Sequence, residues 1–203
     1  MRYFSLLSAV AAAMMLSVSA SYAVPITFTA NLIQANEVPP TGSPGTGLAT
    51  VVLDTTANTM HVDVTFGGLT SGTTASHIHC CLASPFLTGV NVMVATTTPT
   101  FPGFPLGVTS GTYDMSFNLL DAGTYNPAFI TSAFDPSHTV AGAEAALVAG
   151  IESGETYLNI HTTAFPNGEI RGFLAPVPEP ASIALLGGAL AGLFLVGRRR
   201  KVV

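Results

Sequence analysis

Two histidines separated by one residue, His77 and His79, are the clearest candidates for chemistry in this sequence. In an extended strand, residues two apart project from the same face, so both imidazoles point to one side and Ile78 points to the other. The same alternation places the imidazole of His161 on one face of a second strand. If the two strands are neighbours, three neutral imidazoles meet. Such a set of nitrogens is suited to copper or zinc.

A structural role for the same histidines is the alternative, with their nitrogens bonded to backbone or hydroxyl groups. If Ile78 and Ile160 pack into one core, all three histidines lie on outer faces of the sheet. Arg171 is the only cation between residues 24 and 176. It could draw a small anion to a bound metal or pair with a carboxylate as a structural bridge, and the sequence leaves both roles open.

Cys80 and Cys81 are the only cysteines, and three interpretations of them remain open. Strand alternation puts Cys81 on the face of His77 and His79, where its thiolate is a candidate fourth metal ligand. In an oxidising compartment the two cysteines can instead form a disulfide, although adjacent Cα atoms are only about 3.8 Å apart, below the usual range. The third interpretation is a link to another chain, or free thiols.

The sequence gives little support for enzymatic catalysis, and we assign no catalytic residue. No Gly-x-Ser-x-Gly elbow and no Cys-His-Asn signature stands out. Ser137 and His138 are neighbours, but residues 135–138 are better interpreted as a turn. We therefore expect a protein that is not an enzyme.

Strands are the elements that must position these side chains. Apolar and polar residues alternate strictly over residues 59–66, which predicts a strand with one buried face and His61 pointing outward. Further strands are predicted at residues 26–32, 47–53, 74–79, 90–94, 112–117, 156–161 and 169–174. Three prolines between residues 96 and 111 predict a loop or an edge there.

Two short helices interrupt this pattern. Asn126 can cap a helix that starts at Pro127 and runs to about Phe134, and residues 140–151 nearly follow a helical face. The predicted fold class is therefore all-β, a β-sandwich or barrel with a small helical insertion. About 150 residues between the termini suffice for one domain, at residues 24–176.

The charge balance excludes some partners. The whole chain has a net charge of −5, but five of its six cations lie near the termini. Residues 24–176 hold one cation against ten carboxylates, or a charge of about −9 with neutral histidines. Nucleic acid and anionic membrane are thus excluded as expected partners, since both need clustered Lys and Arg. The acidity serves either solubility or cation binding.

The N-terminus has the regions of a secretory signal peptide. Arg2 precedes an apolar stretch from Leu6 to Val18, and small residues lead to a cleavage site after Ala23. We predict a signal peptide over residues 1–23, with a lone N-terminal anchor as the alternative.

The C-terminus contains Val177-Pro178-Glu179-Pro180, an apolar run over residues 181–197 and a basic tail. The run can just span a bilayer, and Arg198, Arg199 and Arg200 would stay on the cytoplasmic side. The order of these parts resembles the PEP-CTERM sorting signal of Gram-negative bacteria. That resemblance implies a transmembrane sorting helix at residues 177–203, a transient inner-membrane anchor, cleavage by an exosortase, and delivery to the cell surface or extracellular matrix. A simple C-terminal anchor is the alternative.

A second resemblance covers most of the remaining chain. Five motifs occur in order: residues 36–40 (Asn-Glu-Val-Pro-Pro), 47–49 (Gly-Leu-Ala), 77–79 (His-Ile-His), 157–162 (Tyr-Leu-Asn-Ile-His-Thr) and 168–172 (Gly-Glu-Ile-Arg-Gly). This ordered set resembles the CHRD domain, first named from chordin. The family implies an immunoglobulin-like, all-β extracellular module without established enzymatic activity. This sequence has Cys80 and Cys81 where the family usually has glycines.

Two functions follow as expectations. The first is an exported, non-enzymatic β-module for adhesion or matrix organisation, with extracellular polysaccharide or surface proteins as partners. The second is a copper- or zinc-binding, redox-active domain that uses His77, His79 and His161, with Cys81 as the candidate fourth ligand. A His-x-His strand outside a sandwich is similar to the copper side of copper/zinc superoxide dismutases.

Overall fold

The computed structural model describes residues 24–81 and 89–178. The predicted signal peptide lies outside this part of the chain, as do the apolar run and basic tail of the sorting signal. Among the described residues, no helix has the length and apolar character needed to cross a membrane.

Within residues 24–81 and 89–178, eight strands form the fold, and the all-β prediction is confirmed. They are β1 (Ile26–Ile33), β2 (Thr46–Asp54), β3 (Thr59–Gly67), β4 (Thr73–His79), β5 (Gly111–Asn118), β6 (Tyr157–Thr162), β7 (Ile170–Phe173) and β8 (Ala175–Pro176). Their order in the sheet is β4-β6-β7-β1-β2-β3-β5, and β8 pairs with β1. All neighbouring strands are antiparallel.

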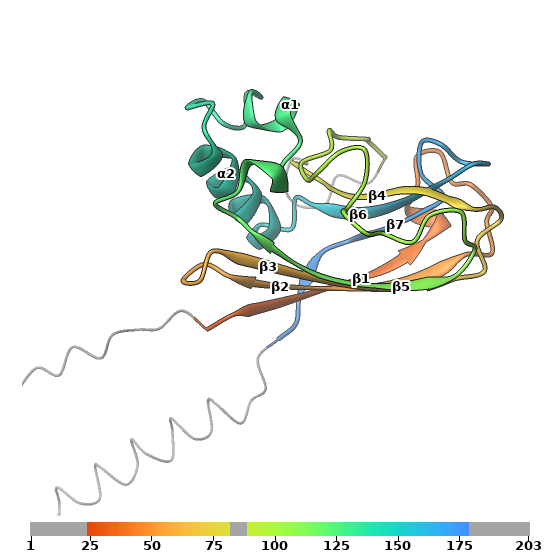
Figure 1. Ribbon diagram of the computed structural model, residues 1–203. Helices are drawn as coiled ribbons and strands as arrows, with labels where there is room; N and C mark the ends of the chain where they lie inside the picture. The colour runs from red at the N-terminus through yellow and green to blue at the C-terminus, as the bar shows by residue number, and fades with distance from the viewer. Residues whose placement is uncertain (1–23, 82–88, 179–203) are drawn as a thin grey trace, which may run out of the picture.

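The sheet curls over itself into a half-barrel. Strands β4, β6 and β7 lie over β1, β2, β3 and β5 (Figure 1), yet all of them belong to one hydrogen-bonded sheet. Strands β7 and β1 are joined by a single residue pair, Arg171 with Ile33, and the immunoglobulin-like arrangement stays a prediction.

The core fills the space inside the curl. The predicted alternation holds in β3, where Met60, Val62, Val64 and Phe66 are buried. Facing strands add further apolar side chains, namely Phe28, Leu32, Val51, Leu53, Ile78, Leu158, Ile160 and Ile170. Burial of each such side chain contributes about 1.5–3 kcal/mol. The intervening residues point outward, among them His61, which contacts Ser116.

Residues 90–107 follow the edge of β4 without becoming a strand. The prediction of a strand at residues 90–94 is wrong, because Val94 is joined to His79 only by an isolated bridge. The predicted loop at residues 96–111 is confirmed. Its backbone bonds to the edge of β4, with Phe101 N donating to Ser76 O (3.1 Å) and Gly107 N to Thr73 O (2.8 Å).

Short helices cover one end of the half-barrel (Figure 1). They are η2 (Ala122–Thr124), α1 (Pro127–Ile130) and α2 (Val140–Glu152), whereas η1 (Gln34–Asn36) follows β1 at the opposite end. Asn126 caps α1 as predicted, because its side chain accepts from Ala128 N. The helix ends at Ile130 rather than Phe134, and a tighter turn follows, in which Ser132 N donates to Phe129 O. The prediction for α2 is confirmed.

Candidate metal centre

The pairing of β4 with β6 brings three histidines together. His77 lies opposite Asn159 and His79 lies opposite Tyr157, so His161 projects from the same sheet face, close to His77. One ring nitrogen from each histidine lies within 4.8 Å of the other two. The two strands are therefore neighbours, as the three-histidine hypothesis requires.

A backbone carbonyl fixes each imidazole. The three pairs are His77 Nε2 with Pro99 O (2.7 Å), His79 Nδ1 with Val92 O (2.7 Å) and His161 Nδ1 with Pro166 O (2.9 Å). A carbonyl can only accept, so each of these ring nitrogens carries the hydrogen. In a neutral imidazole the other nitrogen then bears a lone pair, and these are the three nitrogens that converge.

The converging nitrogens have no donor among themselves. His77 Nδ1 and His161 Nε2 are 3.3 Å apart, and with the tautomers set by the carbonyls neither of them carries a hydrogen. His79 Nε2 is buried and has no hydrogen-bond partner. Buried polar atoms are normally paired, so three facing lone pairs without a donor are an unusual arrangement. A cation placed among them would satisfy all three.

The electrostatics keep these imidazoles neutral. Burial lowers the pKa of His77 to about 4 and that of His79 to about 3, although the carbonyls of Pro99 and Val92 oppose the shift. Burial also lowers the pKa of His161. At neutral pH the three side chains are therefore in the unprotonated form that binds metals.

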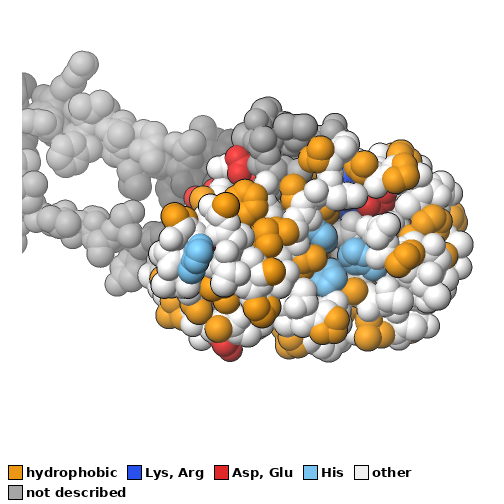
Figure 2. Space-filling model, turned by 90° about the horizontal axis from the view of Figure 1, so that it is seen from above, with side chains coloured by type: hydrophobic (Ala, Val, Ile, Leu, Met, Phe, Trp, Pro, Cys, Tyr) orange, Lys and Arg blue, Asp and Glu red, His pale blue; other side chains and the backbone are white. Residues whose placement is uncertain are grey.

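The histidines are less exposed than predicted. His77 and His79 are only 6% and 8% exposed, because residues 90–100 fold over the outer face of β4 and supply two of the anchoring carbonyls. Ile78 and Ile160 do pack into the core on the opposite face. Histidine side chains gather in a hollow of the surface on this side of the molecule (Figure 2). The cluster is therefore sheltered, but solvent can reach it.

The structure does not bring Cys81 to the histidines. Strand β4 ends at His79, so the alternation that placed Cys81 beside the imidazoles stops there. Cys80 and Cys81 form a disulfide, which leaves no free thiolate. The sulfur of Cys81 packs against α2, 3.9 Å from Ala146 O.

Tyr157 supports His79 from the side. Their rings stack with centroids 4.6 Å apart and planes within 12°, and the Arg171 guanidinium carbon lies 4.5 Å from the centroid of Tyr157. Because β6 lies between β4 and β7, Tyr157 separates His79 from Arg171. The Tyr157 hydroxyl also accepts from Val92 N (3.2 Å), the residue whose carbonyl holds His79.

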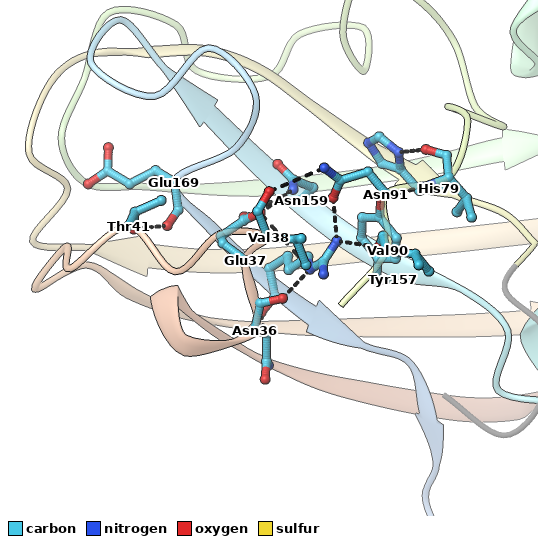
Figure 3. A network of polar contacts seen from close by, with 12 residues as sticks. Asn36, Glu37, Val38, Thr41, His79, Val90, Asn91, Tyr157, Asn159 and Glu169 are labelled. Atoms are coloured by element: carbon cyan, nitrogen blue, oxygen red, sulfur yellow. Dashed lines mark hydrogen bonds and ion pairs between the residues drawn. The ribbon is translucent and has the colours of Figure 1, made fainter. Parts of the chain in front are cut away.

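Arg171 is fully buried and ties two loops together. It donates to Asn36 O, Val90 O (3.2 Å) and Asn91 Oδ1 (2.9 Å), and these three partners are labelled in Figure 3. Its Nε lies 4.0 Å from Glu37 Oε2. Of the two roles left open by the sequence, the structure thus places Arg171 in a structural bridge.

Glu37 completes this buried network. Asn159 Nδ2 donates to both of its carboxylate oxygens, at 3.0 and 3.3 Å. Burial raises the pKa of Glu37 to about 7, and the opposing charge of Arg171 does not offset it. The reason is that the guanidinium directs its donors to carbonyl and amide oxygens rather than to the carboxylate.

Glu169 belongs to a separate buried cluster. Its carboxylate accepts from Ser43 Oγ (2.5 Å), Thr162 Oγ1 (2.5 Å) and Thr70 N (2.6 Å). Although burial acts to raise its pKa, these hydrogen bonds hold it below the usual value. Glu169 therefore fastens two loops to β6 and takes no part in the histidine cluster.

The sequence motifs that were far apart in the chain converge on one face. The two histidine motifs supply the imidazoles, and Glu37, Asn159 and Arg171 form the network beside them. Sequence reasoning missed the supporting roles of Tyr157 and Asn159, although both stood on the same predicted strand face as His161. It also missed the three anchoring carbonyls. Every residue has a backbone carbonyl, so no residue type in the sequence indicates which carbonyls bond to the histidines.

Fold and site together define an all-β domain with a three-histidine cluster on one sheet face. The family model of the CHRD domain matches residues 28–174. The chain belongs to the CHRD domain family. A second model, the PEP-CTERM protein-sorting motif, matches residues 176–201. Comparison with curated proteins and with solved structures gives no match.

The sorting motif indicates where the protein is directed in the cell. It indicates export through an exosortase pathway of Gram-negative bacteria, with the exosortase as a partner. The protein is therefore a secreted one with a CHRD β-domain.

Proposed function

We propose that this exported domain binds one copper or zinc ion through His77, His79 and His161. The observation that carries the proposal is the set of three facing, unprotonated nitrogens whose partner nitrogens are each held by a carbonyl. Metal-binding histidines commonly donate their second nitrogen in this way, which fixes the tautomer and aims the lone pair.

The type of donor favours copper or zinc over harder ions. Imidazole nitrogen suits copper and zinc, whereas calcium and magnesium prefer oxygen ligands. Within the part of the chain that the structure describes, no carboxylate or thiolate joins the three histidines. One position on the metal is then left for solvent or a small ligand, as in open zinc sites.

Metal content is the direct test. The exported protein, purified without chelators or metal-affinity chromatography and repleted with each ion, is expected to hold about one equivalent of copper or zinc by mass spectrometry. The His77→Ala/His79→Ala variant is expected to lose it. His61→Ala is the matched control, because His61 lies on the outer face of β3 and contacts Ser116 instead of the cluster. A folded protein without metal after repletion would contradict the proposal.

A second proposed function is adhesion or matrix organisation at the cell surface. Two observations favour it: the sorting motif, and the hydroxyl groups that cover the outer face of β1, β2, β3 and β5, contributed by Thr27, Thr29, Thr50, Thr65 and Thr112. Extracellular polysaccharide and surface proteins are the partners that this function implies. Deletion of the protein should then reduce cell attachment or matrix yield, and the His77→Ala/His79→Ala variant should restore both. Failure of the wild-type protein to restore them would argue against this role.

A further inference from the structure

We infer that the three-histidine site favours monovalent over divalent metal, so that bound copper is stabilised as Cu(I) relative to Cu(II). This inference rests on the proposed metal-binding function and adds the ion and its oxidation state. Three independent features of the site carry it: the number of ligands, their charge and the buried cation behind them.

The number of ligands is the first feature. The nitrogens come from two adjacent strands, on one side of one sheet, and no other His, Cys, Asp or Glu of the described residues joins them. Divalent copper prefers a tetragonal set of nitrogen and oxygen donors, and three ligands on one side do not supply that set. Monovalent copper has a filled d shell and is stable with three nitrogen donors.

The charge of the ligands is the second feature. The three imidazoles are neutral, and each is backed by a carbonyl rather than by a carboxylate. A carboxylate behind a metal-bound histidine would bring a negative charge to the site, whereas a carbonyl is neutral and brings none. The charge of the ion is therefore uncompensated at His77 and His79, which are almost fully buried. Since the desolvation penalty grows with the square of the charge, a divalent ion bears the larger penalty.

Arg171 is the third feature. Its guanidinium is fully buried and stacks on the opposite side of Tyr157 from His79. Because only the Tyr157 ring lies between them, the positive charge of Arg171 opposes further positive charge at His79. Glu37 offsets Arg171 only in part, at 4.0 Å, and Glu169 is bonded to Thr162, which points to the core side of β6.

The reduction potential of the copper-loaded protein tests the inference. Copper is added to the exported protein, and the Cu(II) signal is followed by electron paramagnetic resonance during reduction by ascorbate, which donates one electron per Cu(II). The potential is expected to lie above that of the aqueous copper couple, because tighter binding of Cu(I) than of Cu(II) raises the reduction potential. Each tenfold difference between the two dissociation constants moves the potential by about 59 mV. A potential at or below the aqueous value would overturn the inference.

A charge variant tests the contribution of the buried network. At pH 8 the Glu37 carboxyl is largely ionised, and Glu37→Gln removes its charge while keeping its shape. The charge of Arg171 is then less compensated, so the potential should rise. Asp63→Asn is the matched control, because it removes one carboxylate from the outer face of β3, away from the site. Equal potentials in the Glu37 variant and the parent would contradict the role of Arg171.

The two proposals fail in different ways. A protein that takes up neither copper nor zinc contradicts the proposed function itself. A protein that binds zinc or Cu(II) at the histidines, but binds Cu(I) more weakly than Cu(II), keeps the proposed function and overturns this inference alone.

Discussion

At the scale of single residues, the histidine cluster depends on side chains that would not bind the metal. Tyr157 stacks on His79 and bonds to the loop whose carbonyl holds the same imidazole. Loss of such supporting groups typically lowers metal affinity by about 10- to 100-fold while the ligands stay in place.

Tyr157→Leu should therefore weaken metal binding about tenfold or more without changing the stoichiometry. The measurement is competition with a chromophoric chelator. Tyr157→Phe keeps the ring and loses the hydroxyl that accepts from Val92 N, so the decrease in affinity should be smaller. Equal metal affinities in the leucine variant and the parent would show that Tyr157 does not support the site.

Glu37 gives a prediction for the dependence of stability on pH. Burial raises the pKa of Glu37 from 4.5 to about 7 in the folded protein, so folding favours its protonated form. Its contribution is fully present below pH 4.5 and is lost as the pH rises through 7. The histidines, with lowered pKa values, act in the opposite direction between about pH 3 and 6.5.

Glu37→Gln separates the two effects, because the glutamine does not titrate. Relative to the variant, the parent should lose about 3 kcal/mol of unfolding free energy between pH 4 and pH 8. Urea unfolding of both proteins across this range measures the difference. A difference that stays constant with pH would show that Glu37 titrates normally.

The residues of the site were predictable only in part. Alternation placed His77 and His79 on one face because it is a local property of strands. The meeting with His161 depends on which strands pair and in which register, which a single sequence leaves open. The carbonyls of Val92, Pro99 and Pro166 depend on the path of whole loops, so no residue pattern indicates them.

At the scale of elements, α2 packs tightly on the disulfide. A Cβ atom on Gly150 would lie 2.5 Å from Cys80 Sγ and 3.0 Å from Cys81 Sγ. Glycine costs a helix about 1 kcal/mol relative to alanine, so alanine would normally be the better residue here. The close approach reverses this preference.

Gly150→Ala should destabilise the protein by about 1–3 kcal/mol, as overpacking of a core does. Thermal or urea unfolding gives the value. In a Cys80→Ala/Cys81→Ala background the sulfurs are gone, and the same substitution should be close to neutral. Destabilisation of equal size in both backgrounds would mean that the disulfide is not what limits this position.

The elements were more predictable than the way they assemble. Alternating residues predicted β3 because its two faces have different surroundings, and the Asn126 cap predicted the start of α1. Residues 90–94 have the composition of a strand but contribute carbonyls to His79 and Arg171 instead of a ladder. The closure of the half-barrel by this segment and the following loop depends on backbone hydrogen bonds between distant parts of the chain.

At the scale of the whole molecule, the sorting motif predicts two forms of the protein. The form before processing carries the C-terminal signal, and the form after processing has lost it. A variant with Pro178→Ala, Glu179→Ala and Pro180→Ala should accumulate in the inner-membrane fraction with a mass that includes Val203. Fractionation and intact-mass measurement provide the test.

The His77→Ala/His79→Ala variant is the control for this experiment, because it leaves the sorting motif intact and should be processed normally. Normal release of the triple variant would contradict recognition of the Pro-Glu-Pro sequence.

The use of backbone carbonyls as anchors has a consequence for how the site is encoded. Two segments, residues 90–100 and the connection between β6 and β7, hold the imidazoles through backbone carbonyls, which every amino acid has. Loop side chains can therefore be exchanged without loss of the anchors, provided that the path of the chain is kept. Three side chains supply the donor atoms, and the path of the backbone sets their geometry. An engineer who wished to transplant this centre would have to copy a chain path rather than a motif.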